Sequence, residues 1–413
     1  MGLFWRNFGI LKQSALRVKA ARCTVLLTEI RRHENTSSGS SSTDKSGDGT
    51  FTADDMEINI VSDEELRKKP DFSTLKFGTV FSDYMFSVKW DTENGWGIPK
   101  IAPVKSFQIH PAAKCLHYAV QVIESFKAYK GIDGNIRIFR PDLNMDRLLL
   151  GAKRLVLPSF DPNELIECVK RLVKLEQEWV PDLKHTALLI RPVYVGTDPT
   201  LGVAVAKSAL LYVLLSPVGS YFAPDFKSAS VLADPKYSRS WPGGSGDLKL
   251  GGNYGHTIYI QRAAEKRKHQ LVLWLHGKNN EITGVHCLNI FFVIRNESGG
   301  TELVTPPLNG LIFPGVTRQS IIDLCQKWKD VQVVERNITI EEVKELLDQK
   351  KLKEMFGTGS MCITCPISSI FFEGSKYDVP TVKQDKPLYD RINTALGDIY
   401  YGRKDDPWGV KVD

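Results

Sequence analysis

The sequence predicts a mixed α/β protein with two domains. Its 413 residues exceed the size of one typical core, so two domains plus appended segments are the default expectation. From Ile58 onward, apolar runs typical of strands alternate with runs that carry a helical period. Between two such blocks, residues 217–226 read PVGSYFAPDF, and this Pro, Gly and aromatic punctuation is typical of an interdomain connection.

The first block, residues 58–216, is expected to form a small N-terminal α/β domain. Its second predicted helix carries a clear three-to-four-residue apolar period. The predicted strands are 77–90, 136–140, 186–195 and 208–216, and the predicted helices are 145–157 and 164–180.

The second block, residues 227–413, is expected to form a larger C-terminal α/β domain. No internal repeat is visible in either block. The predicted strands are 228–234, 271–277, 288–295 and 302–307, and the predicted helices are 318–328 and 340–351.

The N-terminal segment, residues 1–30, resembles a mitochondrial presequence. Residues 1–28 hold five basic residues and no acidic one, and apolar residues recur there at helical spacing. A surface helix of the folded domain is the alternative. Residues 31–57 include a Ser-, Thr-, Gly- and Asp-rich stretch without an apolar period, which predicts a flexible linker. The expected location is therefore the mitochondrial matrix.

Charge and motifs exclude several classes of function. The net charge of +6 falls to near +1 without the N-terminal five, so no nucleic-acid partner is expected. The longest apolar run, residues 209–215, is too short to cross a membrane. No nucleotide-binding or zinc-binding motif is present, so no metal is expected. The seven cysteines lack regular spacing, which favours reduced thiols.

A lysine in a glycine-rich segment is the first candidate for chemistry. Residues 246–255 read GDLKLGGNYG and place Lys249 between glycines. Glycines let the backbone approach a ligand closely, and a lysine held there can meet an aldehyde cofactor as a Schiff base. Burial would favour the neutral amine by lowering its pKa. A solvated lysine in an ordinary loop is the alternative.

The start of a predicted helix is the second candidate. Residues 314–320 read PGVTRQS and lead into the helix-like IIDLCQKW. The free amides of a helix start favour an anion, so a cofactor phosphate would sit on Val316 and Thr317. The alternative is an ordinary threonine N-cap.

Six segments together resemble the branched-chain amino acid aminotransferase family, a fold-type IV group of pyridoxal-phosphate enzymes (D-amino acid aminotransferase-like). The resemblance runs from about Phe77 to Tyr401. It implies a homodimer that transfers the amino group of leucine, isoleucine or valine to 2-oxoglutarate, with pyridoxal 5'-phosphate as cofactor. The segments are LNMDRLL (143–149), LLIRPVYVG (188–196), LKLGGNYG (248–255), LVTPPLNG (303–310), FPGVTRQS (313–320) and FGTGSMCITCP (356–366).

The resemblance implies roles for five cofactor-binding residues. Lys249 matches the lysine that joins the cofactor and moves the substrate proton. Tyr254 matches the tyrosine whose phenol hydrogen-bonds the cofactor's ring oxygen. Arg147 matches the arginine that binds the phosphate, and the amides of Val316 and Thr317 assist it.

On the substrate side, Phe77, Tyr118 and Val203 match apolar walls of the side-chain pocket. Arg191 matches the residue that meets the distal carboxylate of glutamate. An apolar pocket that also holds this arginine accepts both a branched side chain and a dicarboxylate.

A short segment near the C-terminal end matches two further features. Amides near Ser360 and Met361 match those that hold the substrate carboxylate. Cys362 and Cys365 match the redox-sensitive dithiol of animal family members. Two inert buried thiols are the alternative, because thiol reactivity depends on exposure.

The family pattern is broken around the cofactor. Residues 283–289 read TGVHCLN where the family reads Thr-Glu-Val-Gly-Thr-Met-Asn, so Gly284 stands in place of the glutamate that keeps the pyridine nitrogen protonated. Cys287 replaces a threonine, Leu189 a tyrosine and Ser125 a glycine. One hypothesis is compensation by His286, which shares strand parity with Gly284.

Two alternatives to full activity therefore stay open. One is a catalytically weak or inactive pyridoxal-phosphate-binding protein with a regulatory role, because loss of a charged partner of that kind costs several kcal/mol in a transition state. The other is a different fold-type IV aminotransferase or a lyase. The chirality of the substrate consumed would separate the latter.

Overall fold

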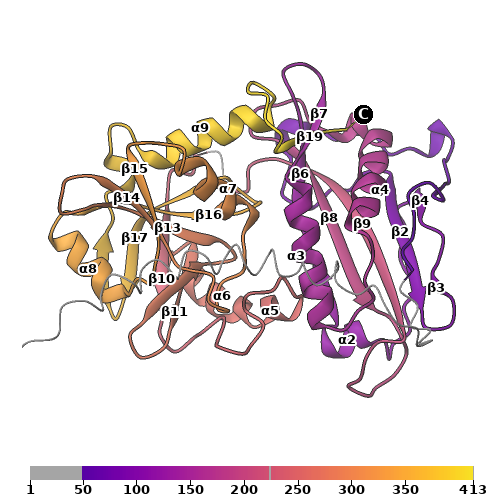
Figure 1. The fold of residues 1–413 in the computed structure, drawn as a ribbon, viewed down its shortest axis with the longest axis horizontal. Coiled ribbons are helices and arrows are strands. Elements are labelled where there is room, and N and C mark those ends of the chain that lie inside the picture. The colour runs from indigo at the N-terminus through magenta and orange to yellow at the C-terminus, as the bar shows by residue number, and fades with distance from the viewer. Residues whose placement is uncertain (1–48, 223–224, 413) are drawn as a thin grey trace, which may run out of the picture. The chain divides into compact units, whose positions relative to one another are not determined.

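Two β-sheets organise the folded chain. The computed structural model describes residues 49–222 and 225–412, which belong to one compact unit, Asp48–Asp413. Figure 1 shows the first sheet with helices α3 and α4 on the right and the second sheet with helices α7, α8 and α9 on the left. The predicted targeting segment 1–30 lies outside the described residues.

The first sheet has ten strands in the described part of the chain. Their order is β1-β4-β2-β9-β8-β6-β7-β19, with β3 paired to β2 and β5 paired to β8. All pairs are antiparallel except β1 with β4. The strands are β1 (Glu57–Ile58), β2 (Tyr84–Asp91), β3 (Gly95–Trp96), β4 (Lys100–Pro103), β5 (Gln121–Ile123), β6 (Phe126–Lys130), β7 (Ile136–Phe139), β8 (Ala187–Gly196), β9 (Ser208–Val218) and β19 (Gly409–Lys411).

The helices of this half are α2 (Lys114–Tyr118), α3 (Pro141–Arg154) and α4 (Pro162–Leu175), with 3-10 helices η1 (Asp63–Glu65), η2 (Phe72–Thr74) and η3 (Gln177–Trp179). Asp161 caps α4 by accepting a hydrogen bond from the amide of Asn163, and Pro162 occupies its first turn. The apolar period of α4 is buried against the sheet, through Leu165, Cys168, Val169 and Leu172. The helix predicted to residue 180 ends at Leu175 and continues as η3.

Two expectations for this half need correction. The strand predicted over 77–90 begins only at Tyr84, since Gly78 adopts a left-handed conformation that no continuous strand allows. The linker predicted over 31–57 also ends too late. Phe51 is only 3% exposed and packs on Phe86 and Trp96. A single aromatic in a polar stretch has no period, so the sequence pattern did not reveal it.

The second sheet has nine strands in the described residues. Their order is β12-β11-β10-β17-β16-β13-β14-β15, with β18 paired to β17. Parallel and antiparallel pairs are mixed. The strands are β10 (Ala229–Ala233), β11 (Leu271–His276), β12 (Glu281–Val285), β13 (Asn289–Arg295), β14 (Thr301–Thr305), β15 (Val331–Glu335), β16 (Leu352–Thr358), β17 (Cys365–Phe372) and β18 (Ser375–Asp378).

The helices of this half are α5 (Gly252–Gly255), α6 (Thr257–Lys266), α7 (Val316–Cys325), α8 (Ile340–Asp348) and α9 (Leu388–Tyr400), with the 3-10 helix η4 (Thr381–Lys383). Strand β13 is apolar on both faces because both are covered. Phe291 and Val293 belong to the cluster that contains α7 and α9, whereas Ile290 and Phe292 belong to the cluster that contains α8.

The end of the chain returns to the first sheet. Strand β19 pairs with β7, and α9 runs toward that sheet along the upper edge in Figure 1. The predicted assignment of all of 227–413 to a separate second domain is therefore wrong for residues 409–411. A three-residue strand carries too little pattern to reveal its partner. Among the described residues, no helix has the length and apolarity that a membrane crossing requires.

Candidate active site

The segment that carries Lys249 is tied to strand β5. The carbonyl of Lys249 accepts a hydrogen bond from the amide of Ile123 at 3.1 Å, and the amide of Gly251 donates to the carbonyl of Gln121 at 2.9 Å. A Cβ on Gly251 would lie 2.4 Å from Gln121 Oε1. A larger residue at position 251 would therefore force the flexible side chain of Gln121 to move.

The side chain of Asn253 holds the same loop by hydrogen bonds. Asn253 Nδ2 donates to the carbonyls of Ser245 and Leu248 at 2.6 and 2.9 Å, and Ser245 Oγ donates to Asn253 Oδ1 at 2.8 Å. Because these bonds hold both sides of Lys249, its backbone is fixed before any ligand binds.

Lys249 meets a buried carboxylate. Its Nζ lies 3.7 Å from Glu124 Oε2, and the lysine is 9% exposed. Burial lowers the pKa of Lys249 to about 8, even though the charge of Glu124 acts in the opposite direction. The neutral form is therefore a minority near pH 7 but far more populated than in an exposed lysine, which favours a nucleophilic role.

Glu124 is held ionised by Arg147. Arg147 Nε and Nη2 donate to its two oxygens at 2.6 and 2.8 Å, and Asn144 Nδ2 donates at 2.9 Å. Burial alone would raise the pKa of Glu124, but the charges of Arg147 and Lys249 and the hydrogen bonds from Arg147 and Asn144 together outweigh burial and lower this pKa to about 2. Arg147 Nη1 also donates to the carbonyl of Pro314 at 2.9 Å. This bond places the guanidinium beside the start of α7.

The start of α7 presents free backbone amides. Gly315 is its N-cap residue and supplies no side-chain cap, so Val316 and Thr317 begin the helix without a capping hydrogen bond. A Cβ on Gly315 would lie 2.0 Å from Asn289 Oδ1, which is buried without a hydrogen-bond partner in the described part of the chain. The structure thus brings Arg147, Val316 and Thr317 together, as an anion site requires.

Further polar groups surround Lys249. The positive charge of Arg191 helps to lower the pKa of Lys249. Burial lowers the pKa of Arg191 itself. Burial raises the pKa of Tyr254 to about 12, so its phenol stays protonated. Cys287 interacts with the charge of Lys249, and burial raises the pKa of the Cys287 thiol to about 11. The structure therefore gathers Lys249, Arg191 and Tyr254 in one site with Cys287.

Apolar side chains line one edge of this site. Phe77 packs against the cluster of Ala187, Leu189 and Val218. Its ring lies 5.2 Å from that of Tyr221, measured between centroids. Phe77 and Leu189 therefore belong to one apolar surface.

A turn between β16 and β17 closes another edge. The amide of Gly359 donates to the carbonyl of Cys362 at 3.2 Å, so Ser360 and Met361 form the tip of the turn. Cys287 Sγ lies 3.8 Å from Met361 Sδ. This contact joins the turn to the groups around Lys249.

The two thiols of this turn are free in the structure and close together. A hydrogen bond with Cys362 raises the pKa of Cys365, and burial adds to the effect. Cys362 is partly exposed and Cys365 is buried. Cys362 is therefore the more accessible of the pair.

Two expected substrate residues lie apart from this site in the described chain. Val203 is 85% exposed and Tyr118 is 39% exposed. The phenol of Tyr118 donates to the carbonyl of Leu201, which joins the two on the surface. Neither residue walls the pocket of its own chain.

The compensation expected from His286 is wrong. Strand β12 ends at Val285, and His286 turns out of the strand with a φ of 51°. Burial lowers its pKa, and its charged neighbour is Glu265 of α6 rather than Lys249. The alternation of side chains along strand β12 therefore ends at Val285 and does not place His286 on the same face as Gly284.

Gly284 leaves no room for a larger side chain without a shift. A Cβ there would lie 2.9 Å from the carbonyl oxygen of Leu288. The tight turn that holds this oxygen is closed by hydrogen bonds between Val285 and Leu288 in both directions. The segment matched to the pyridine-nitrogen site thus carries no carboxylate, and a side chain at position 284 would require the backbone near Leu288 to shift.

The residues suit the amine and phosphate ends of pyridoxal phosphate. A buried lysine with a lowered pKa faces the aldehyde end, and Arg147 with the first amides of α7 suits the phosphate. At the ring-nitrogen end the usual charged partner is missing. The site therefore suits the aldehyde and the phosphate of the cofactor but lacks a charged partner for its ring nitrogen.

Motif reasoning missed Glu124, Tyr221, Arg239 and Lys127 as site residues. Arg239 Nη2 donates to the carbonyl of Gly246 at 2.8 Å, and its charge acts on the pKa of Tyr254. Lys127 Nζ donates to the carbonyl of Met361 at 3.1 Å. Strand β6 reads FKAYK, so Lys127 falls on the partly exposed face of an alternating strand, and the sequence pattern gives no signal for its role.

Comparison with known proteins gives the class first. The family model described as Amino-transferase class IV matches residues 121–370. The chain therefore belongs to the class IV aminotransferases. The matched range contains the lysine loop, the start of α7 and the 359–362 turn.

Within that class, the chain belongs to the branched-chain-amino-acid aminotransferase family. It is 46% identical over 364 residues to the cytosolic branched-chain-amino-acid aminotransferase of Ovis aries, covering 88% of this chain and 94% of that protein. It is 45% identical over 363 residues to the mitochondrial branched-chain-amino-acid aminotransferase of Mus musculus, covering 88% and 92%. These identities confirm the predicted family.

A solved structure shows the same fold. The branched-chain aminotransferase from Thermoproteus uzoniensis superposes with a TM-score of 0.63 at 23% identity, covering 80% of this chain and 100% of that one. This likeness confirms the predicted fold-type IV architecture with its mixed sheets.

Proposed function

We propose that this protein transfers the amino group of L-leucine, L-isoleucine or L-valine to 2-oxoglutarate, with pyridoxal 5'-phosphate as cofactor. The observation that carries the proposal is the buried amine of Lys249, whose pKa burial lowers to about 8. Membership of the branched-chain-amino-acid aminotransferase family supports the substrate class.

The cofactor, when bound, supplies the aldehyde that receives the amino group and a ring that takes up electrons. Lys249 holds the cofactor and then, as a free neutral amine, moves the proton at the substrate Cα. Glu124 lies 3.7 Å from this amine and keeps the pKa of Lys249 from falling further. Arg147 holds Glu124 ionised and meets the phosphate together with Val316 and Thr317.

Substrate selection follows from the walls of the site. Phe77 and Leu189 offer apolar surface for a branched side chain. Arg191 offers a buried guanidinium for the distal carboxylate of 2-oxoglutarate or glutamate. The amides of Ser360 and Met361, at the tip of their turn, hold the carboxylate that both substrates share.

The test is amino-group transfer by a lysine variant. Lys249→Ala is expected to lower glutamate formation from leucine and 2-oxoglutarate at least about a hundredfold, because it removes the proton-transfer group. Lys278→Ala, at an exposed position of the same half, is the matched control and should retain full activity. Retention of more than about a tenth of the rate by Lys249→Ala would refute the proposal.

We further propose a homodimer in which the exposed pair Tyr118 and Val203 walls the partner's site. Exposure of Val203 at 85%, beside exposed Leu201 and Leu116, supports an apolar contact surface. Val203→Asp should shift the mass measured by light scattering toward that of one chain. An unchanged mass would contradict this surface.

We also propose the mitochondrial matrix as the location and a redox response of Cys362 and Cys365. Support comes from the basic, acid-free residues 1–28 and from the hydrogen-bonded thiol pair. The N-terminus of protein from purified mitochondria tests the first. Mass spectrometry after peroxide treatment, with Cys362→Ser as control, tests the second.

A second candidate function is cofactor binding with feeble or no transfer. Gly284 favours it, because no carboxylate faces the ring-nitrogen end. A cofactor absorbance band that fails to shift on adding leucine would support this candidate. Gly284→Glu should raise the rate only if the missing carboxylate is limiting. Gly284→Ala crowds Leu288 in the same way without adding charge and is the control.

A further inference from the structure

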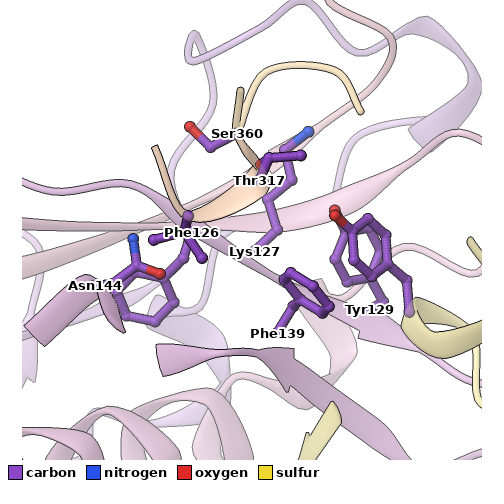
Figure 2. A pocket seen from close by; sticks show the side chains of 9 residues that line it. Phe126, Lys127, Tyr129, Phe139, Asn144, Thr317 and Ser360 are labelled. Atoms are coloured by element: carbon purple, nitrogen blue, oxygen red, sulfur yellow. The ribbon is translucent and has the colours of Figure 1, made fainter. Parts of the chain in front are cut away.

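Residues from both halves of the chain line a cavity beside the proposed site. It is small, about 30 Å³, which is room for about two water molecules. Strand β6 and helix α3 contribute Lys127 and Asn144, and the second half contributes Val316, Thr317 and Ser360. Figure 2 shows the Lys127 side chain reaching toward Thr317 and Ser360.

Lys127 brings a cation to this cavity without an anionic partner. Its Nζ donates to the neutral carbonyl of Met361, and no ion pair of Lys127 is found in the part of the chain that the structure describes. Burial lowers its pKa to about 8, opposed only by Cys362, so the charged form still dominates at pH 7. The Lys127 side chain is only partly exposed, and a partly desolvated cation without a counter-charge is less stable than one in water.

The other cavity walls do not supply that counter-charge. Burial raises the pKa values of Tyr129 and Tyr400, so both phenols stay neutral. Val316 and Thr317 present the positive end of α7 to the same space. The start of α7 therefore does not offset the charge of Lys127, and the cavity suits an anion.

Strand register connects this cation to the apolar surface that contains Leu189. Lys127 of β6 lies directly opposite Leu189 of β8, so their side chains share one face of the sheet. Leu189 in turn packs with Phe77. A molecule with a carboxylate at Lys127 and Ser360 would thus place its aliphatic chain on Leu189 and Phe77.

We propose that Lys127 is a carboxylate-binding residue that supplies the charge for the carboxylate shared by the amino-acid and 2-oxo-acid substrates. This inference rests on the proposed function. The register of Lys127 opposite Leu189 favours a carboxylate that carries an aliphatic chain. The phosphate of the cofactor is the other source of an anion, and the experiment separates the two.

The experiment measures binding rather than turnover. Calorimetry on cofactor-loaded protein gives the Kd of 4-methylpentanoate, which carries leucine's carboxylate but no amine. The neutral 4-methylpentanamide has nearly the same shape and is the ligand control. Lys127→Met should weaken carboxylate binding about tenfold or more and leave amide binding unchanged, since only the charge-assisted bond is lost.

Three further variants sharpen the result. Lys127→Gln removes the charge but keeps a donor for the carbonyl of Met361, and it should weaken carboxylate binding as Lys127→Met does. Lys127→Arg restores the charge and should recover most of the affinity. Lys130→Met, at an exposed lysine of the same strand, should bind like the unaltered protein.

Several results would overturn the proposal. Equal weakening of acid and amide binding would make Lys127 a structural support of the 359–362 turn. A tenfold weaker affinity for pyridoxal phosphate with unchanged carboxylate binding would assign the anion to the cofactor. Charge-dependent binding in a protein that transfers no amino group would leave this inference standing while the proposed function fails.

Discussion

Replacing Glu124 by glutamine tests the electrostatic centre of the site. Glutamine keeps the shape and an acceptor for Asn144, but it leaves Arg147 as a buried cation without a counter-charge. Burial raises the pKa of Glu124, but the charges of Arg147 and Lys249 together with the hydrogen bonds from Arg147 and Asn144 lower it from 4.5 to about 2. This depression corresponds to about 3 kcal/mol at neutral pH, in line with the cost of breaking a buried ion pair.

The expected result is a melting temperature about 5 °C lower at pH 7 for Glu124→Gln, measured by calorimetry. A lowered folded-state pKa stabilises above the unfolded value, so the gap between the two proteins should narrow as pH falls from 4.5 toward 2. Glu178→Gln, at an exposed ion pair with Lys69, is the control and should leave the melting temperature close to that of the unaltered protein. Equal melting temperatures at pH 7, or a gap that persists unchanged at low pH, would refute the reasoning.

Three other changes have definite expected outcomes. The rate at which cofactor-free protein attaches pyridoxal phosphate, followed by absorbance, should rise with pH with a midpoint near pH 8 and level off above it, because the neutral amine of Lys249 attacks; a midpoint above 10 would contradict its lowered pKa. Lys114→Met should destabilise by about 3–5 kcal/mol in thermal melts, since it leaves Asp198 buried and unpaired, and adding Asp198→Asn should recover most of the loss. Gly251→Ala should slow cofactor attachment because its Cβ would lie 2.4 Å from Gln121 Oε1, and trimming Gln121 to alanine should restore the rate.

The elements with a strong period were predictable from the sequence. Helix α4 repeats apolar residues every three to four positions, and strand β13 is continuously apolar because both of its faces are covered. Phe51 and the strand β19 were not predictable. Each depends on a partner more than 30 residues away in the chain, Phe86 for Phe51 and β7 for β19, and neither segment carries a pattern of its own.

The candidate site was predictable where a residue lies in a distinctive segment. Lys249, Arg147 and Thr317 stand in such segments, and the structure gathers them. Glu124 and Lys127 lie in or beside β strands whose pattern says only that they are partly buried. Their roles arise from contacts with Arg147 and the 359–362 turn, which only the folded chain creates.

The lysine that joins the cofactor defines the active site. Burial lowers the pKa values of two lysines in the site, Lys249 and Lys127, to about 8. The pKa alone therefore does not show which of the two attaches the cofactor. Borohydride reduction of protein saturated with pyridoxal phosphate, followed by peptide mass spectrometry, identifies the attachment point. We expect the phosphopyridoxyl group on Lys249. Attachment at Lys127, or at no lysine of the site, would contradict the account.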